Sequence, residues 1–412
     1  MNDIRTPRGR RERTMHLSPD AERLVTGGLG LANSGSRTED RFWQAQIEER
    51  LEKLLESNHS QVIDQALERL QQTDLEAYGA LVEAVEEVAE CVRVEHKGEI
   101  WEILLVAAPF IAWTRFGIAS GALDSALTQK LASHWKTHLI AEGAKFGMLP
   151  FLYSIDQLPR DFAQLRKLTR RLGAVALADQ KPKNEQKSPP ETADMLADNR
   201  FLLGAVAVPA GKAMFRWQSI DKPRYASRVQ CLEDWILDAR PLLEPILVGC
   251  GFECLLPDAF HINIRESDRR VRPYAIKAAA HFLTLTLQVE AKQLKATIAA
   301  FGTDQVDEYR IGFSLPDNKE VLQGVVWPLL GSEVHAEPAQ ASDGAEGDLQ
   351  FPLEQIKQIL KDVGITDIEV WRDVGQPEYC DDCGAPLFPN DDQELAHTEL
   401  PEDLEVERPQ FH

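Results

Sequence analysis

The sequence of 412 residues has a formal net charge of −21, and 43% of its residues are hydrophobic. Its length fits a globular chain of two to four domains, and the acidic surplus excludes a generally basic surface for nucleic acid or anionic membranes. No apolar run reaches membrane-spanning length, no export signal is visible, and six cysteines do not form a disulfide framework, so we expect a cytoplasmic protein without membrane contact.

The first hundred residues predict a basic, disordered tail at 1–16 and a helical domain at 17–97. Trp43, Ile47, Leu51 and Leu55 recur at helical spacing. The glycine cluster "VTGGLGLANSG" follows a helical segment and lacks the spacing of a dinucleotide fingerprint. We expect a helix stop and a loop there.

From residue 98 onward, apolar runs rich in Val, Ile and Leu alternate with helical segments, which is typical of buried strands. We predict α/β repeats at 98–177 and 201–300, joined by a polar linker at 178–200. A shorter third repeat is expected at 301–378, followed by a CxxC element and an acidic tail at 379–412. The expected fold class is α+β or α/β, with the helical domain followed by one mixed-sheet body of two or three strand–helix–strand units.

The repeat rests on matches between distant stretches. "ILLVAAPFIAWTRF" (103–116) resembles "LLGAVAVPAGKAMFRW" (202–217), and each leads to a helix with a tryptophan, Trp135 or Trp235. Each unit then has a basic segment, "LPRDFAQLRKLTRR" (158–171) or "LPDAFHINIRESDRR" (256–270). In the third copy, "GVVWPLLG" and "ILKDVGI" are followed by the CxxC stretch instead.

Cys380 and Cys383 form the only CxxC of the chain, followed by Gly384 and, further on, by His397. Two thiolates at this spacing with a following glycine are typical of a zinc knuckle, so Zn²⁺ is the one expected cofactor. Candidates for the fourth ligand are His412, Glu399, or Cys250 and Cys254, although packing also explains the last two. A redox dithiol and a turn with two free thiols stay open, and Asp381 and Asp382 disfavour a reactive thiolate.

Arginines at equivalent repeat positions are the candidate anion-binding residues. They are Arg115 and Arg216, Arg170 and Arg171, and Arg269 and Arg270. Such side chains can bind phosphate or carboxylate groups in a bidentate manner, but they can equally pair with the abundant acids of this chain. No aromatic platform is interleaved with them, so nucleic acid is not the favoured partner.

Other constellations are weaker. His134, His138 and Glu142 could lie on one face of a helix as metal ligands, although the segment also has the pattern of a surface helix. No nucleophile elbow, P-loop or HExxH motif occurs.

The stretches "NSGSRTEDRFW", "LLGAVAVP", "ESDRRVRPY", "EYRIGF", "GVVWPLLG" and "YCDDCGAPL" resemble an uncharacterised bacterial family of unknown function. The resemblance covers nearly the whole chain and implies a cytoplasmic bacterial protein, with no activity or site residues to carry over. We therefore expect a non-enzymatic binding or regulatory protein for an anionic ligand or a protein partner. The alternative hypothesis is an enzyme that acts on an anionic small molecule in a groove between the repeats.

Overall fold

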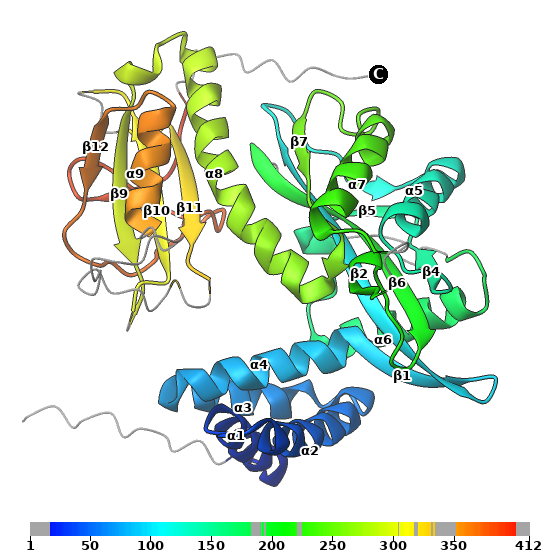
Figure 1. Cartoon of the computed structure of the whole chain (residues 1–412). Coiled ribbons are helices and arrows are strands. Elements are labelled where there is room, and N and C mark those ends of the chain that lie inside the picture. The colour runs from blue at the N-terminus through cyan, green and yellow to red at the C-terminus, as the bar shows by residue number, and fades with distance from the viewer. Residues whose placement is uncertain are drawn as a thin grey trace, which may run out of the picture.

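The structure is a computed structural model that describes residues 17–182, 190, 192, 195–220, 225–303, 305–316, 320–330, 333 and 352–400. An N-terminal helical layer lies beside an eight-stranded sheet, and the long helix α8 runs from this sheet to a four-stranded sheet (Figure 1). The predicted basic tail at 1–16 lies outside the described residues. None of the described helices is long and apolar enough to cross a bilayer.

Four helices form the N-terminal layer: α1 (Pro19–Ala32), α2 (Arg37–Glu56), α3 (Ser60–Thr73) and α4 (Leu75–Glu90). The helix stop and loop predicted at the glycine cluster lie at its end, because α1 continues through the glycines to Ala32 and a loop follows only at Asn33. A Cβ at Gly27 would lie 2.7 Å from the Ile47 side chain, and one at Gly30 would lie 2.4 Å from the Trp43 ring. The glycines thus allow α1 to pack closely on α2.

The eight-stranded sheet has two long central strands, β2 and β6, which pair antiparallel from Trp101–Pro209 to Trp113–Ala197. Its strands are β1 (Cys91–His96), β2 (Glu99–Trp113), β3 (Gly121–Ala122), β4 (Lys145–Met148), β5 (Phe151–Ser154), β6 (Ala197–Pro209), β7 (Gly251–Cys254) and β8 (Asp258–Ala259). The helices that cover it are α5 (Ser125–His138), α6 (Phe162–Leu177), α7 (Arg228–Leu243) and α8 (Phe260–Leu287).

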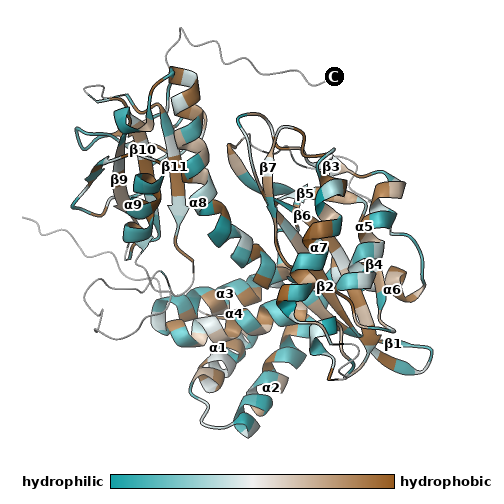
Figure 2. Ribbon diagram, turned by 45° about the horizontal axis from the view of Figure 1, so that its top comes forward, coloured by the Kyte–Doolittle hydropathy of each residue, from teal (hydrophilic) through white to brown (hydrophobic). Residues whose placement is uncertain are grey.

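Both faces of the central strands are buried over most of their length, which explains the long apolar runs in their sequences (Figure 2). Leu105 and Leu203 point into a core shared with α1–α4 and α6. Val106 and Leu202 point into a second core shared with α5 and α7. Alternate residues of one strand thus serve two cores.

The elements of this part follow one order twice. The first series is β2, α5, β4, β5 and α6, with the two-residue strand β3 added between β2 and α5, and the second is β6, α7, β7, β8 and α8. The short strands cross over, since β4 and β5 pair with β6 while β7 and β8 pair with β2. Neither series can therefore complete its own half of the sheet.

A four-stranded sheet forms a separate part of the molecule, in the order β11-β10-β9-β12. Its elements are β9 (Lys295–Phe301), β10 (Glu308–Ser314), β11 (Gln323–Pro328), α9 (Pro352–Asp362) and β12 (Asp367–Val370). The α+β class and the N-terminal helices are confirmed, but the expected single mixed-sheet body is divided into two. The C-terminal half of α8 and α9 bury Ile276, Leu283 and Ile356 against the strands, so this sheet has a core of its own.

Two predicted boundaries also shift. β9 lies within the predicted unit 201–300 but belongs to the second sheet, and β6 begins at Ala197 inside the predicted linker 178–200. The polar start of β6 is buried because Arg200 pairs with Asp198 and donates to the carbonyl oxygens of Ile118 and Ala119. Buried polar residues that are hydrogen-bonded in this way break the apolar pattern of a buried strand, so the sequence alone predicts a linker there.

Candidate metal centre and adjoining cleft

Three side chains near the C-terminus converge on one point. The ligand atoms of Cys380, Cys383 and His397 all lie within 4.8 Å of one another. Cys383 Sγ and His397 Nε2 are 3.2 Å apart. Two sulfurs and one imidazole nitrogen are donors that Zn²⁺ prefers, so the predicted triad forms a candidate metal site.

The two cysteines lie in a tight turn rather than at the start of a helix. Gly384 has φ +72° and donates its N–H to Cys380 O at 2.8 Å, while the Cys380 N–H donates to Ala385 O at 2.8 Å. Hydrogen bonds from the backbone N–H groups of Cys383 and Asp382 lower the pKa of the Cys380 thiol. The Asp382 carboxylate opposes this shift, as expected, but does not outweigh it. A turn that directs N–H groups at sulfur favours the thiolate that a metal requires.

His397 is oriented by its other ring nitrogen. Nδ1 lies 2.9 Å from the carbonyl oxygen of Thr398, which can accept its proton. The Nε2 lone pair then faces the sulfur atoms. A backbone acceptor behind a ligating imidazole is the usual arrangement in metal sites.

The buried side chain of Arg310 supports the CxxC turn from the side of the second sheet. Arg310 in β10 is 0% exposed and donates to the carbonyl oxygens of Glu378 and Leu387, at 2.6 and 2.7 Å. Its guanidinium also lies 4.9 Å from the Phe301 ring centroid and 5.0 Å from that of Tyr379. Because residues 378 and 387 flank the CxxC turn, Arg310 fixes both ends of the turn on the second sheet. This role has no signal in the sequence, since the partners of Arg310 are distant backbone atoms.

Among the described residues, the candidates for a fourth ligand are not brought to the triad. Cys254 is buried in the core beneath α7, where burial raises the pKa of its thiol to about 12. Cys250 lies at the same end of the larger sheet, with its sulfur 3.8 Å from Val248 O. Glu399 is exposed and is not part of the cluster, and His412 lies outside the described residues. Of the two readings left open for Cys250 and Cys254, a metal-ligand role at this site is excluded, because both residues pack at the edge of the other sheet.

A cavity of about 760 Å³ adjoins the metal centre, and we call it the interlobe cleft. It lies between the end of β2, the C-terminal half of α8, β11 and the CxxC segment. Representative lining residues are Arg115, Phe116, Phe282, Val325, Pro386 and Phe388. Arg115 is the one charged side chain among the described lining residues.

The six predicted anion-binding arginines are spread over the molecule. Arg115 lies at the interlobe cleft, with its guanidinium 4.9 Å from the centroid of the Phe116 ring. Arg216 lines a different hollow of about 940 Å³ and donates to Thr137 O. Opposite positions in the repeat therefore do not meet in one pocket.

The paired basic segments contact acids of the protein itself. Arg170 in α6 lies 3.0 Å from Glu56 of α2. Burial raises the pKa of Tyr153 to about 12, against the opposing charge of Arg171. Arg170 thus lies at the boundary with the N-terminal helices, whereas Arg171 lies near Tyr153 of β5.

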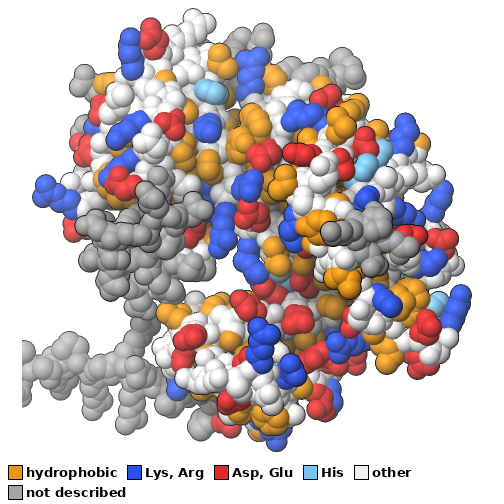
Figure 3. Space-filling view, in the orientation of Figure 1, with side chains coloured by type: hydrophobic (Ala, Val, Ile, Leu, Met, Phe, Trp, Pro, Cys, Tyr) orange, Lys and Arg blue, Asp and Glu red, His pale blue; other side chains and the backbone are white. Residues whose placement is uncertain are grey.

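On α8, Arg270 pairs with Glu266 at 2.6 Å and with Glu253 at 3.3 Å, and both Arg269 and Arg270 line a hollow of about 500 Å³. Figure 3 shows Lys or Arg and Asp or Glu side chains next to one another along the middle of the molecule, where α8 crosses between its parts. This surface is mixed in charge rather than uniformly basic.

Comparison with known proteins gives one match. Residues 9–411 match the family described as "Protein of unknown function (DUF2863)". Curated proteins and solved structures gave no match. Because the matched range covers nearly the whole chain, this protein belongs to that family of unknown function.

Proposed function

We propose that this protein is a non-enzymatic binding protein for an anionic ligand with an apolar part, and that a structural Zn²⁺ holds one wall of its site. The observation that carries the proposal is that one short segment belongs both to the candidate metal site and to the wall of the interlobe cleft. Ala385, Pro386 and Phe388 line the interlobe cleft and follow Cys383 directly in the chain. A metal at Cys380, Cys383 and His397 would therefore fix that wall.

The lining supports binding over catalysis. It is largely apolar, with aromatic rings from Phe116, Phe282 and Phe388, and Arg115 is its one described charge. No His, Cys, Asp, Glu or Lys occurs among the described lining residues, so the Thr398 hydroxyl has no general base beside it in that lining. An apolar cavity with one guanidinium matches a carboxylate or sulfonate on a hydrophobic body.

Two wider features belong to the same proposal. The six cysteines are unpaired, which supports a reducing compartment and hence a cytoplasmic location. The repeated element order and the register of β2 with β6 support an internal duplication whose offset is close to 100 residues and equals 100 residues at the centre of the ladder. At that offset Leu105 matches Ala205, and these two residues pair with each other in the middle of the ladder.

Ligand binding can be tested with 1-anilinonaphthalene-8-sulfonate, an anionic aromatic probe, and with laurate as a competitor. We expect Arg115→Met to weaken probe binding about tenfold, which corresponds to the loss of roughly 1.4 kcal/mol of a charge-assisted contact. Arg216→Met is the matched control because Arg216 lies in another hollow. Equal affinity in the Arg115 variant and the wild type, with unchanged circular dichroism, would refute the proposed site.

Zinc is tested separately by metal analysis of the purified chain. We expect a thiolate-bound Zn²⁺ that is lost in Cys380→Ser/Cys383→Ser, together with weaker probe binding because the wall at Phe388 loosens. A metal-free wild-type chain with normal stability and normal probe binding would refute the structural zinc, while the proposal of ligand binding in the interlobe cleft would stand.

A further inference from the structure

A second group of metal-binding side chains lies far from the cysteines, between α5 and α7. His134 and His138 are four residues apart on α5, and Asp234 and Asp238 are four residues apart on α7. Each pair therefore lies on one face of its helix. The two faces meet, because Asp238 contacts both histidines.

The packing beneath this group fixes the two helices against each other. Trp135 and Trp235 follow His134 and Asp234 in the chain and are 1% and 0% exposed. Their rings meet edge to face with centroids 5.9 Å apart. At the offset of 100 residues, His134 matches Asp234 and His138 matches Asp238. A pseudo-twofold arrangement of α5 and α7 would thus oppose an HxxxH face to a DxxxD face.

The donor atoms converge on a single carboxylate oxygen. Asp238 Oδ2 lies 2.8 Å from His134 Nδ1 and 2.7 Å from His138 Nε2. The two imidazole rings are nearly parallel, with an interplanar angle of 9° and centroids 5.9 Å apart. All three ligand atoms fall within 4.8 Å of one another.

We infer that His134, His138 and Asp238 form a second site for a divalent transition-metal ion of the Zn²⁺ class. Bond lengths of about 2.0–2.1 Å in a tetrahedral site separate the donors by roughly 3.3 Å. The two nitrogen–oxygen distances therefore need to open by only about 0.5 Å, which side-chain rotation supplies without helix movement. Two imidazoles and one carboxylate leave a fourth position for water or for Asp234.

Charge balance supports a cation rather than a simple hydrogen-bonded cluster. Among the described residues, neither Asp234 nor Asp238 has a Lys or Arg partner within 4.0 Å. Gln230 donates to Asp234 Oδ1 at 2.9 Å, but this contact brings no charge. A dication at Asp238 would compensate both carboxylates at any pH at which the imidazoles are neutral.

Asp234 also lies behind the ring of His138 in this arrangement. Its Oδ2 lies 3.9 Å from His138 Nδ1, the ring nitrogen that faces away from Asp238. Metal binding at Nε2 leaves the proton on Nδ1, directed towards this carboxylate. A carboxylate behind a ligating histidine raises the basicity of the ring and fixes its orientation.

The site is tested in the Cys380→Ser/Cys383→Ser chain, which cannot use the C-terminal thiolates. We expect a Co²⁺ titration to give one bound ion per chain, with d–d absorption but no thiolate-to-metal charge-transfer band, and Zn²⁺ to displace it. Asp238→Asn and His134→Ala should each weaken Co²⁺ binding by at least about tenfold, because each substitution removes a direct ligand. His281→Ala removes an exposed histidine of α8 and should leave binding unchanged.

Thermal unfolding gives an independent readout. Zn²⁺ should raise the melting temperature of the Cys380→Ser/Cys383→Ser chain, because a ligand of the folded state shifts the folding equilibrium, and this rise should vanish when Asp238→Asn is added. If the Cys380→Ser/Cys383→Ser chain binds no ion, or if the same chain with Asp238→Asn binds it as tightly, the inference is overturned. A loss of stability in His134→Ala without any metal effect would identify the group as a helix–helix hydrogen-bond cluster alone.

Discussion

Glu90 shows how a single buried acid joins the N-terminal helices to the rest of the molecule. It is the last residue of α4, is buried, and its Oε2 accepts the backbone N–H of His261 at 2.8 Å. It thereby caps the N-terminus of α8, where Ala259 offers no side-chain cap. Burial raises the pKa of Glu90 to about 7, and burial next to Arg265 lowers the pKa of His261 to about 4.

We expect Glu90→Gln to stabilise the protein at pH 8. The folded-state pKa of Glu90 lies above its ordinary value of 4.5. The folded protein therefore holds a proton that the unfolded chain releases, and the free energy of unfolding falls as pH rises from about 4.5 to 7. The Glu90→Gln substitution removes the charge and keeps a side-chain oxygen that accepts the N–H of His261. It should raise the free energy of unfolding by roughly 3 kcal/mol above pH 7 and by much less at pH 5.

Urea denaturation at pH 5 and pH 8 measures this difference. Glu83→Gln is the control, because Glu83 is an exposed residue of the same helix. A Glu90→Gln variant that is less stable than wild type at pH 8 would show that the charge itself caps α8. Since "EEVAEC" places several similar residues near each other, the sequence could not indicate which acid is buried.

At the scale of elements, the C-terminal segment is joined to the second sheet by close contacts at glycines. The hairpin β13 (Phe388–Pro389) and β14 (Leu395–Ala396) lies on this sheet. A Cβ at Gly324 in β11 would lie 2.4 Å from the Phe388 ring, and one at Gly312 in β10 would lie 2.2 Å from Pro389 O. The absence of two side chains thus sets the position of the metal centre and of one wall of the interlobe cleft.

We expect Gly324→Ala to displace this hairpin while the sheet itself stays folded, because the new methyl group must push the Phe388 ring away. The cost should be of the order of 1–3 kcal/mol, as for overpacking of a core. Limited proteolysis of residues 376–398 and metal retention measure the displacement. Gly79→Ala is the matched control: nothing lies within 4 Å of the added Cβ, and we expect a gain of up to about 1 kcal/mol in helix α4. Unaltered proteolysis and metal content in Gly324→Ala would contradict the proposed contact.

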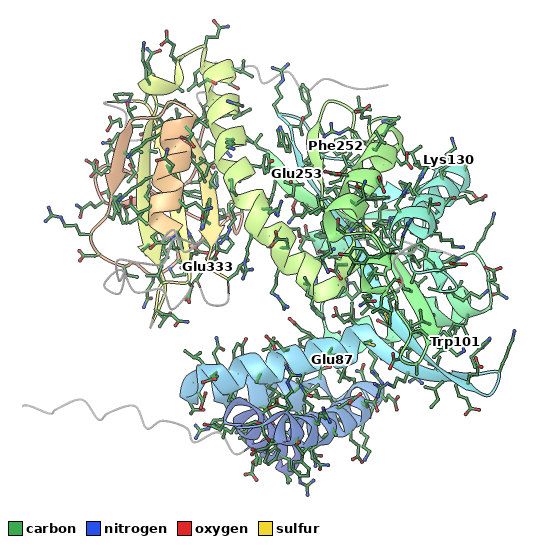
Figure 4. The ribbon with its side chains drawn as sticks, viewed as in Figure 1. Glu87, Trp101, Lys130, Phe252, Glu253 and Glu333 are labelled. Carbon is green, nitrogen blue, oxygen red and sulfur yellow. The ribbon has the colours of Figure 1, made fainter. Side chains whose placement is uncertain are left out.

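At the scale of the whole molecule, α8 holds the two sheets in place. Its Arg272 pairs with Glu333 at 2.8 Å, and Tyr274 donates to Glu253 at 2.6 Å. In Figure 4, Glu253 lies on the side of α8 that faces the larger sheet, and Glu333 lies on the side of the smaller sheet. One helix thus contacts both parts of the molecule, and Pro273 lies within this helix between Arg272 and Tyr274.

A double-mutant cycle tests whether the two repeated series are coupled at their centre. We expect Trp135→Leu and Trp235→Leu to be non-additive by about 0.5–1.5 kcal/mol, the usual value of an edge-to-face aromatic pair. Trp327→Leu is the control partner, because this fully buried tryptophan belongs to the core of the second sheet. Its combination with Trp135→Leu should be additive in chemical denaturation. Additive effects for the first pair would show that the two rings contribute only by separate burial.

The sequence by itself determined the features that local spacing encodes. Helical periodicity located the N-terminal helices, apolar runs located β2 and β6, and the CxxC spacing with His397 located the three ligands of the candidate metal site. These succeed because neighbouring residues share one helix face, one strand or one turn.

Only the tertiary structure decided which distant segments meet. It paired β4 and β5 with β6, separated the second sheet, and placed Cys250 and Cys254 away from the metal centre. It also paired Arg170 and Arg270 with acids of the protein and brought Asp238 to His134 and His138. An arginine or aspartate has the same local signal whether it binds a ligand or a neighbouring side chain, so its role is set by the long-range packing that chooses its partner.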